Sequence, residues 1–407
     1  MRFKDSRVAK FTLVVASLVL TIGLGEAASR LLYFVHGNGH LYEMNSQEYA
    51  LPLGWQLVRG AHLDFHINQQ GFRHPKDITL QPQQDTVRIF LVGGSTAFGN
   101  EGVYRQVNPQ RLTDRDTIDY HLQSILAARH PGVRFEVINA AVSEYRLFQE
   151  ITLFREKLVN FRPQLVIFLD GHNDISFLTA GTALTDDPNP YWDNRHFLRA
   201  QRVLNSSSGL APLYYLDLYL GRASYFYHGM STVFQHLSET SFMAKTQAFE
   251  STNSWGNRPF RLLDEVSSKE QYQHKLRELD KVLPLYIDQV KDLRAIAKER
   301  QINIVYAMQP EIVTEDPGNL TTKERTIQQI AFEQHRDLGT LSWRYLTVKI
   351  AGILGTFGND QFEFVDLVTV AHKNTQDEYT DYCHLTSQGN RVVAEKLYPA
   401  VQRLLKL

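Results

Sequence analysis

From about Val87 to the end of the chain, short apolar runs alternate with segments of helical spacing, and this alternation is the feature that most restricts the fold. The runs that we expect to form strands are residues 87–92, 135–138, 165–169, 302–308 and 362–367. The segments that we expect to form helices are residues 116–130, 147–161, 272–300, most of 327–350, and a last helix after Leu385. Strands that alternate with helices indicate a parallel sheet sandwiched between helices. The sequence therefore predicts an α/β fold.

Residues 176–268 break this alternation between the third predicted strand and the next helix. They are rich in aromatic and turn residues, so we interpret them as an insertion near the carboxyl edge of the sheet. Tyr191, Trp192 and Trp255 in this insertion are candidates for lining a carbohydrate groove, and packing of the insertion is the simpler interpretation. Residues 36–86 are expected to form a mixed, loop-rich lead-in before the α/β region.

The first 35 residues differ from the rest of the chain. Apolar runs cover residues 11–25 and 31–35, and they follow the basic residues Arg2, Lys4, Arg7 and Lys10. A basic flank before an apolar helix predicts a signal anchor that crosses the membrane once, with its basic end in the cytoplasm and the body outside, in the periplasm if the cell is Gram-negative. A cleavable signal peptide is the alternative, because Gly25-Glu26-Ala27 loosely resembles a cleavage site.

Composition excludes several classes of protein. The chain has 407 residues and a formal net charge of -1, whereas nucleic-acid-binding proteins usually carry a basic excess, so we expect no nucleic-acid partner. The single cysteine, Cys383, cannot form an intramolecular disulfide. The sequence has no CxxC, HExxH or clustered His/Cys pattern, so it predicts neither a metal site nor an organic cofactor.

Polar residues stand directly after three of the predicted strands. Gly93-Gly94-Ser95 follows the first strand, Asn139-Ala140-Ala141 the second, and Asp170-Gly171-His172-Asn173-Asp174 the third. Because parallel strands end at the same edge of a sheet, we expect these segments to lie close together. Each residue also has a plain structural explanation when it is taken alone: Ser95 as a turn residue, and Asn173 as a strand-end cap.

A fourth segment, Asp381-Tyr382-Cys383-His384, lies near the C-terminus. Acyl transfer needs a nucleophile, a base with an orienting acid, and donors for an oxyanion. The Ser95 hydroxyl can be the nucleophile, His384 can accept its proton, and Asp381 can orient the imidazole. Taken alone, Asp381 is also suited to capping a turn, and His384 to a loop before the last helix.

Together these segments resemble the SGNH (GDSL-like) hydrolase superfamily, whose four blocks occur in this order. Residues 93–95 are similar to the serine block, 139–141 to the glycine block, 171–174 to the asparagine block, and 381–384 to the last. The resemblance covers roughly residues 68–407. The subgroup with an N-terminal anchor and an "N-x-x-G-F-R" stretch, here residues 68–73, looks closest.

The resemblance implies a flavodoxin-like three-layer fold and serine esterase or acyl-transfer chemistry. It assigns Ser95, Asp381 and His384 to a catalytic triad, and Ser95, Ala141 and Asn173 to an oxyanion hole. Residues 87–407 are then the catalytic domain, after a 1–35 anchor and a 36–86 lead-in.

The sequence departs from the family pattern at three positions. The serine block reads GGS instead of GDS, a variant of this subgroup. Ala141 stands where the family has glycine, so its N–H is kept, but a positive φ there is costlier for alanine. Glu144 stands where a second glycine is frequent, and it adds a carboxylate near the site.

Three neighbours of the motif residues carry separate expectations. Asp174 is expected to fix the loop that presents Asn173, and His172 is a candidate for contact with the substrate. Cys383 is interpreted as a buried filler, because its evident partner is the histidine that Ser95 requires.

The sequence thus predicts a membrane-anchored serine esterase or O-acyltransferase that forms an acyl-Ser95 intermediate. Its location outside the cytoplasm favours O-acetyl groups of a polysaccharide as the substrate. The alternatives are a hydrolase of lipids or small esters, and a non-catalytic glycan-binding or assembly module on a decayed hydrolase fold, which the alanine at position 141 motivates.

Overall fold

The structure is a computed structural model. It describes residues 7–35, 47–50, 53–61, 65–179, 269–334, 341–371 and 376–407, apart from Val103, Arg105, Gln106 and Gln110, together with residues 216, 219, 220, 224–227, 229 and 230. The chain divides into two compact units, Met1–Tyr49 with Asp193–Ser254, and Ala50–Trp192 with Trp255–Leu407.

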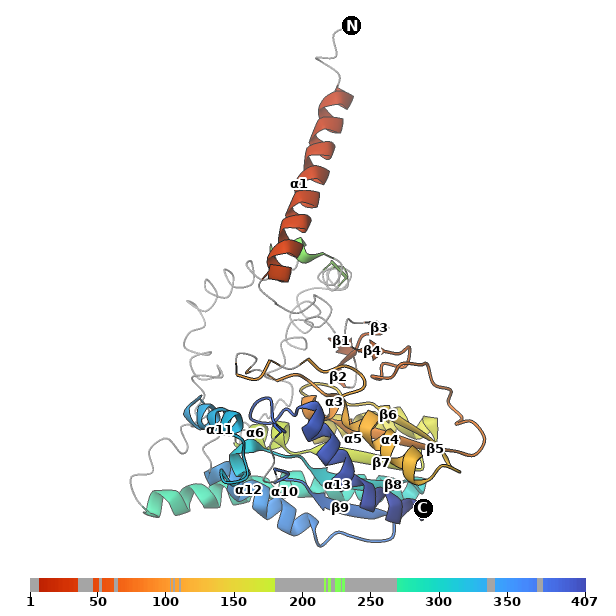
Figure 1. Ribbon diagram of the computed structural model, residues 1–407, viewed down its shortest axis with the longest axis vertical. Helices are drawn as coiled ribbons and strands as arrows, with labels where there is room; N and C mark the ends of the chain where they lie inside the picture. Colours follow the sequence, from red (N-terminus) through yellow and green to blue (C-terminus); the bar gives the residue numbers. More distant parts are fainter. Residues whose placement is uncertain are drawn as a thin grey trace. The chain divides into compact units, whose positions relative to one another are not determined.

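The first unit contains the long N-terminal helix α1 (Arg7–Val35), drawn in red in Figure 1. Its stretch Lys10–Leu32 has 23 residues and is apolar and long enough to cross a membrane, a property that signal sequences share. Glu26 in this stretch accepts hydrogen bonds from Ser224 Oγ at 2.7 Å and from the backbone N–H groups of Tyr225 and Phe226 at 3.2 and 3.0 Å. The carboxylate of Glu26, which interrupts the apolar helix, therefore has hydrogen-bond donors inside the same unit.

The second unit is built on a parallel sheet of five strands. The strands are β5 (Thr86–Gly93), β6 (Arg134–Asn139), β7 (Leu165–Asp170), β8 (Asn303–Met308) and β9 (Phe362–Asp366), and they lie in the order β6-β5-β7-β8-β9. Every residue of the central strand β7 is buried, as expected for a parallel strand whose two faces are covered. The strand order reverses at β5, and open α/β sheets bind ligands at such a point.

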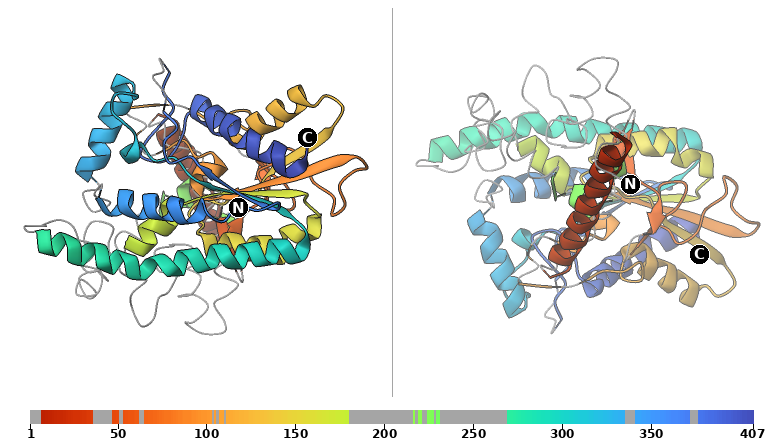
Figure 2. Two further views of the ribbon diagram at one scale, coloured as in Figure 1. Left: turned by 90° about the horizontal axis from the view of Figure 1, so that it is seen from below. Right: turned by 90° about the horizontal axis from the view of Figure 1, so that it is seen from above.

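Helices cover both faces of this sheet, which confirms the predicted α/β fold with helix, sheet and helix layers (Figure 2, left). One layer contains α4 (Ile118–Arg129) and α13 (Ser387–Leu405), and the other contains α5 (Leu147–Glu156) and α10 (Lys269–Arg300). The last helix turns the expected residues inward, namely Val393, Leu397, Val401 and Leu404. Its N-terminus is capped by Thr386, whose hydroxyl accepts a hydrogen bond from the N–H of Gly389 at 3.0 Å.

The lead-in contains only short strands among its described residues. They are β1 (Gln47–Ala50), β2 (Gly54–Leu57), β3 (Gly60–Ala61) and β4 (His66–Ile67), and β3 pairs with β4 in antiparallel fashion. Gly71 has a φ of 76°, so the 68–73 stretch turns at a residue whose conformation favours glycine.

One predicted helix is wrong in its extent. The helix expected over 147–161 ends at Glu156 and is followed by the 3₁₀ helix η1 (Leu158–Phe161), because Lys157 has the non-helical φ of -126°. The segment expected over 327–350 contains α11 (Thr322–Gln334) and α12 (Leu341–Leu354). Most of the predicted insertion, with Tyr191, Trp192 and Trp255, lies outside the described residues.

Candidate active site

The position of Ser95 is determined by two glycines at the end of β5. Ser95 is the first residue of the short helix α3 (Ser95–Phe98). A Cβ atom at Gly93 would lie 2.4 Å from the carbonyl oxygen of Leu169, and one at Gly94 would lie 2.5 Å from Nδ2 of Asn173. A side chain at Gly93 would clash with the backbone of β7, and one at Gly94 would displace the amide of Asn173. The two glycines thus allow the close approach that places Ser95 beside the ends of β5 and β7.

The side chains of Ser95, His384 and Asp381 form a continuous chain of hydrogen bonds. His384 Nε2 lies 2.8 Å from Ser95 Oγ, and His384 Nδ1 lies 2.8 Å from Asp381 Oδ2. Asp381 Oδ1 accepts the backbone N–H groups of Cys383 at 2.9 Å and His384 at 2.8 Å. With Nδ1–H donated to the carboxylate, Nε2 is the acceptor for the Ser95 hydroxyl proton, which is the geometry of a nucleophile with its general base.

The electrostatics of this chain favour an imidazolium at His384. Burial raises the pKa of Asp381, but the charge of His384 and three hydrogen bonds outweigh it and hold that pKa well below its usual range. Burial lowers the pKa of His384, but the Asp381 carboxylate and the Glu311 carboxylate raise it above its ordinary value. Asp381 therefore remains charged and stabilises the proton that His384 takes up.

Cys383 lies inside this segment and is buried. Burial raises the pKa of its thiol well above the usual value, and the charge of Asp381 adds to that shift. Both effects disfavour the thiolate, in agreement with the interpretation of Cys383 as a buried filler.

Asp381, Cys383 and His384 also form the one group of three potential metal-ligating side chains among the described residues, with ligand atoms within 4.8 Å of one another. Asp381 and His384 are already bonded to each other and to Ser95, so we assign no metal to them.

The side chain of Asn173 lies beside Gly94, the residue before Ser95. Asn173 is the second residue of α6 (His172–Thr179), which begins directly after Gly171 at the end of β7. One N–H of its side-chain amide is donated to the carbonyl oxygen of Tyr145 at 2.8 Å, which fixes the amide against Gly94. The other N–H of this amide, and the backbone N–H of Ser95 at the start of α3, are the donors that a substrate oxygen could meet.

The third predicted donor is already used in this structure. The N–H of Ala141 donates to Oδ1 of Asn139 at 3.1 Å. Ala141 is not among the residues with positive φ, so the expected difficulty with alanine does not arise there. The left-handed backbone occurs at Glu144 instead, with a φ of 68°, at the second position where glycine is frequent in the family. Its exposed carboxylate is not part of the triad.

The loop before Asn173 is supported by buried carboxyl groups. Asp174 Oδ2 accepts the N–H of Leu147 at 2.8 Å, which supports the expectation that Asp174 fixes this loop. Burial and the nearby charge of Asp170 raise the pKa of Asp174 well above its usual value. Tyr286 and Tyr306 each donate their hydroxyl to Asp170, at 3.0 and 2.9 Å. A neutral Asp174 and a hydrogen-bonded Asp170 can then share this site without mutual repulsion.

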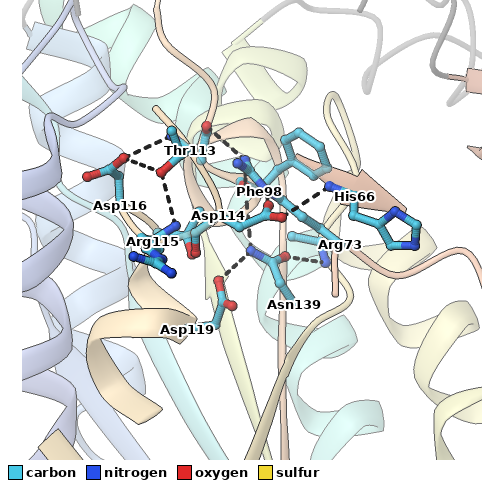
Figure 3. A network of polar contacts seen from close by, with 12 residues as sticks. His66, Arg73, Phe98, Thr113, Asp114, Arg115, Asp116, Asp119 and Asn139 are labelled. Atoms are coloured by element: carbon cyan, nitrogen blue, oxygen red, sulfur yellow. Dashed lines mark hydrogen bonds and ion pairs between the residues drawn. The ribbon is translucent and has the colours of Figure 1, made fainter. Parts of the chain in front are cut away.

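Arg73 supports the other end of the nucleophile helix (Figure 3). Its Nη1 donates to the carbonyl oxygens of Phe98 at 2.9 Å and Gly99 at 3.2 Å, and its Nε pairs with Asp114 at 3.0 Å. Asn139 Nδ2 also donates to Phe98, at 3.4 Å. The arginine of the "N-x-x-G-F-R" stretch thus holds the last turn of α3 in place.

Two residues of this edge were missed from the sequence, Gln309 and Glu311. Gln309 directly follows the last residue of β8 and Glu311 comes two residues later, so the end of that strand was the signal that could have found them. Glu311 Oε1 lies 2.7 Å from Nδ1 of His172, which places His172 in a second histidine–carboxylate pair.

Comparison with known proteins does not identify the function of this site. No protein-family model matches the chain, and no curated protein matches it. Among solved structures, the chain is similar to an extracellular lipase from Streptomyces rimosus, with 12% identity, 77% of this chain and 99% of that chain covered, and a TM-score of 0.34. It is also similar to a GDSL-like lipase from Bacteroides thetaiotaomicron, with 11% identity, coverage of 78% and 88%, and a TM-score of 0.31.

A third similar structure is an acetyl-xylooligosaccharide esterase from a Geobacillus species, with 12% identity, coverage of 77% and 94%, and a TM-score of 0.33. Scores of this size carry no inference about function. The chemical class of the site therefore follows from the contacts of Ser95, His384 and Asp381.

Proposed function

We propose that this chain is an SGNH-type serine esterase or O-acyltransferase that acts through an acyl-Ser95 intermediate. The observation that carries the proposal is the chain of two 2.8 Å contacts from Ser95 Oγ through His384 to Asp381. All three side chains lie at the carboxyl edge of one parallel sheet, where this fold binds ligands.

In the first half of the reaction, Ser95 Oγ attacks the carbonyl carbon of the ester and its proton passes to Nε2 of His384. The negative charge that develops on the carbonyl oxygen is stabilised by the Ser95 N–H and by the amide of Asn173. Collapse of this intermediate breaks the ester bond, and the leaving alkoxide receives the proton from His384. The acyl group is then bound to Ser95.

In the second half, His384 removes a proton from the acceptor, whose oxygen attacks the acyl-Ser95 carbonyl. Water as the acceptor gives hydrolysis, and a sugar hydroxyl gives transfer. The bond between the acyl group and Ser95 Oγ then breaks, and Oγ recovers its proton from His384.

For the substrate, we propose ester groups of a polysaccharide outside the cytoplasm, with O-acetyl groups as the first choice. The support is the apolar stretch Lys10–Leu32 behind a basic flank, which suits a single membrane anchor with the body outside. Reporters of cytoplasmic and external location fused after Leu407 test this topology, and a folded cytoplasmic reporter at that end would contradict it. A mature chain that begins near Ala28 would identify a cleaved signal peptide instead.

The experiment that tests the activity is an assay of the purified full chain with chromogenic acetyl esters, with and without oligosaccharide acceptors. Release of acetate, or acetylation of the acceptor, is expected from the wild-type chain and not from Ser95→Ala. Preference for long acyl chains would favour a lipid hydrolase. Equal background rates for both proteins, with intact glycan binding, would favour the non-catalytic module.

A further inference from the structure

Glu311 is a buried carboxylate that the reaction described above does not use. It stands between β8 and the 3₁₀ helix η3 (Ile312–Thr314), and only 3% of its surface is exposed. Its Oε1 atom accepts a hydrogen bond from Gln309 Nε2 at 3.2 Å and lies 2.7 Å from His172 Nδ1. A carboxylate with so little exposure needs such partners to remain charged.

Through Gln309, Glu311 is connected to the segment of the nucleophile. The same Nε2 group of Gln309 lies 3.3 Å from Oγ1 of Thr96, the residue directly after Ser95. Thr96 in turn donates its hydroxyl to the carbonyl oxygen of Cys383 at 3.1 Å. This path joins the end of β8 to the helix that carries Ser95 and to the loop that carries the catalytic acid and base.

Through His172, Glu311 is connected to the oxyanion donor and to the same loop. His172 is the residue before Asn173, and its ring stacks on the ring of Tyr382, with centroids 5.1 Å apart and an interplanar angle of 28°. The carbonyl oxygen of Tyr382 accepts the N–H of Ile312, the residue after Glu311, at 3.0 Å. The Glu311 side chain and the adjacent backbone therefore connect three segments in a single network. These are the helix that carries Ser95, the start of the helix that carries Asn173, and the loop that carries Asp381 and His384.

We infer that Glu311, with His172, is a positioning and charge-stabilising pair of the esterase site, and that its carboxylate supports the imidazolium of His384 alongside Asp381. This inference rests on the proposed function. It assigns His172 to the support of the site, in place of the substrate contact that the sequence suggested.

The electrostatics agree with this assignment. Burial raises the pKa of Glu311 above its ordinary value, and the charges of His172 and His384 offset only part of that shift. The Glu311 charge acts in the same direction as Asp381 on His384, because both raise the pKa of its imidazole. The Asp381 carboxylate also acts on Glu311 and raises its pKa. Three further groups interact with Glu311, have raised pKa values and stay neutral near pH 7: Tyr379, Tyr382 and Cys383.

The test separates the charge of residue 311 from its hydrogen bonds. Glu311→Gln keeps an oxygen that can accept from His172 but removes the negative charge. The acidic limb of the kcat/KM profile should then move to lower pH, because His384 loses one of the two carboxylate charges that raise its pKa. Glu311→Asp keeps the charge and shortens the side chain, so kcat should fall several-fold while the limb stays near that of the wild type.

A matched control is Glu324→Gln. Glu324 is also buried, and its Oε1 accepts the N–H groups of Glu378 and Tyr379 at 2.6 and 3.0 Å. The loss of its charge should leave the acidic limb in place. Thermal unfolding of each variant checks that it folds.

An acidic limb that is unmoved in folded Glu311→Gln would overturn the inference. If that variant does not fold, a wild-type kcat in Glu311→Asp overturns it instead. Failure of the proposed function is a separate result, because it would appear as full activity in Ser95→Ala.

Discussion

The two histidine–carboxylate pairs at the edge of the sheet have the same kinds of side chain, but their imidazoles contact different groups. In the first pair, His384 and Asp381 are three residues apart in the chain, and the free side of the imidazole meets Ser95 Oγ at 2.8 Å. In the second, His172 and Glu311 come from the ends of β7 and β8, and the imidazole is stacked on Tyr382.

The comparison teaches that a carboxylate-bound histidine is not by itself a catalytic base. The base is defined by the atom that its second nitrogen reaches, and for His384 that atom is the hydroxyl oxygen of Ser95. The other pair supports the geometry and charge of the first.

The largest expected effect separates the two histidines. His384→Ala should lower kcat by about 10⁴- to 10⁶-fold, because triad members act as a unit. His172→Ala should lower kcat by roughly 10-fold, since it disturbs the position of Asn173 and leaves the proton transfer intact. Steady-state kinetics with an acetyl ester measures both. Comparable losses in two folded variants would break the distinction between the pairs.

The next effect concerns Asn173. It follows His172 in the chain, and we propose that its amide stabilises the oxyanion formed when Ser95 attacks the ester. Asn173→Ala should reduce kcat by about 100- to 1,000-fold with little change in KM, because the hydrogen bond strengthens only as the oxyanion forms. Asn160→Ala is the matched control, since the amide of Asn160 donates to the carbonyl oxygen of Glu156 at the surface. A loss confined to KM would assign Asn173 to binding of the ground state.

The pH profile sharpens the comparison further. A base must be neutral to accept the Ser95 proton, so kcat/KM should rise with pH through the pKa of His384. Because the pKa of His384 is raised above the ordinary value of 6.5, the wild-type limb should lie above that pH. Asp381→Asn should move the limb to lower pH and also reduce kcat, by about 10⁴-fold in the most severe case. A limb below 6.5 in the wild type would show that the two carboxylates do not act on His384 as described.

The smallest effect is on the free energy of unfolding, and it tests whether the strained backbone lies at Glu144 and not at Ala141. Glu144→Gly should raise the free energy of unfolding by up to about 1 kcal/mol, because its left-handed backbone suits glycine. Ala141→Gly should lower it by roughly 0.5 to 1 kcal/mol, because the φ there is negative and glycine loses more entropy on folding. Denaturant unfolding measures both, and opposite signs from these would place the strain at Ala141.

The alternation of apolar runs and helical spacing was enough to predict the α/β fold, because strands such as 165–169 are buried on both faces and leave an unbroken apolar run. The contacts among Ser95, Asp381 and His384 could be expected, because each residue stands in a short motif whose residues are neighbours in the chain. The break at Lys157 could not, because a single non-helical residue leaves the apolar spacing on both sides unchanged.

Glu311 was hidden for a different reason. Its partner His172 is 139 residues away in the chain, and neither residue belongs to a pattern of fixed spacing that points to the other. The sequence left the sign of φ at Ala141 open, and the left-handed conformation lies three residues later, at Glu144. Family spacing indicated that a glycine-like turn was present, but it did not indicate which residue adopts it.

The central claim is that Ser95 is a nucleophile activated by His384 and Asp381, and labelling with a fluorophosphonate tests it most directly. The purified full chain is treated with the reagent, digested, and analysed by mass spectrometry to locate the phosphonyl group. We expect stoichiometric modification of Ser95 in the wild type, much slower modification in His384→Ala, and none in Ser95→Ala. Absence of label in the wild-type chain, or label of equal extent in Ser95→Ala, would contradict the assignment.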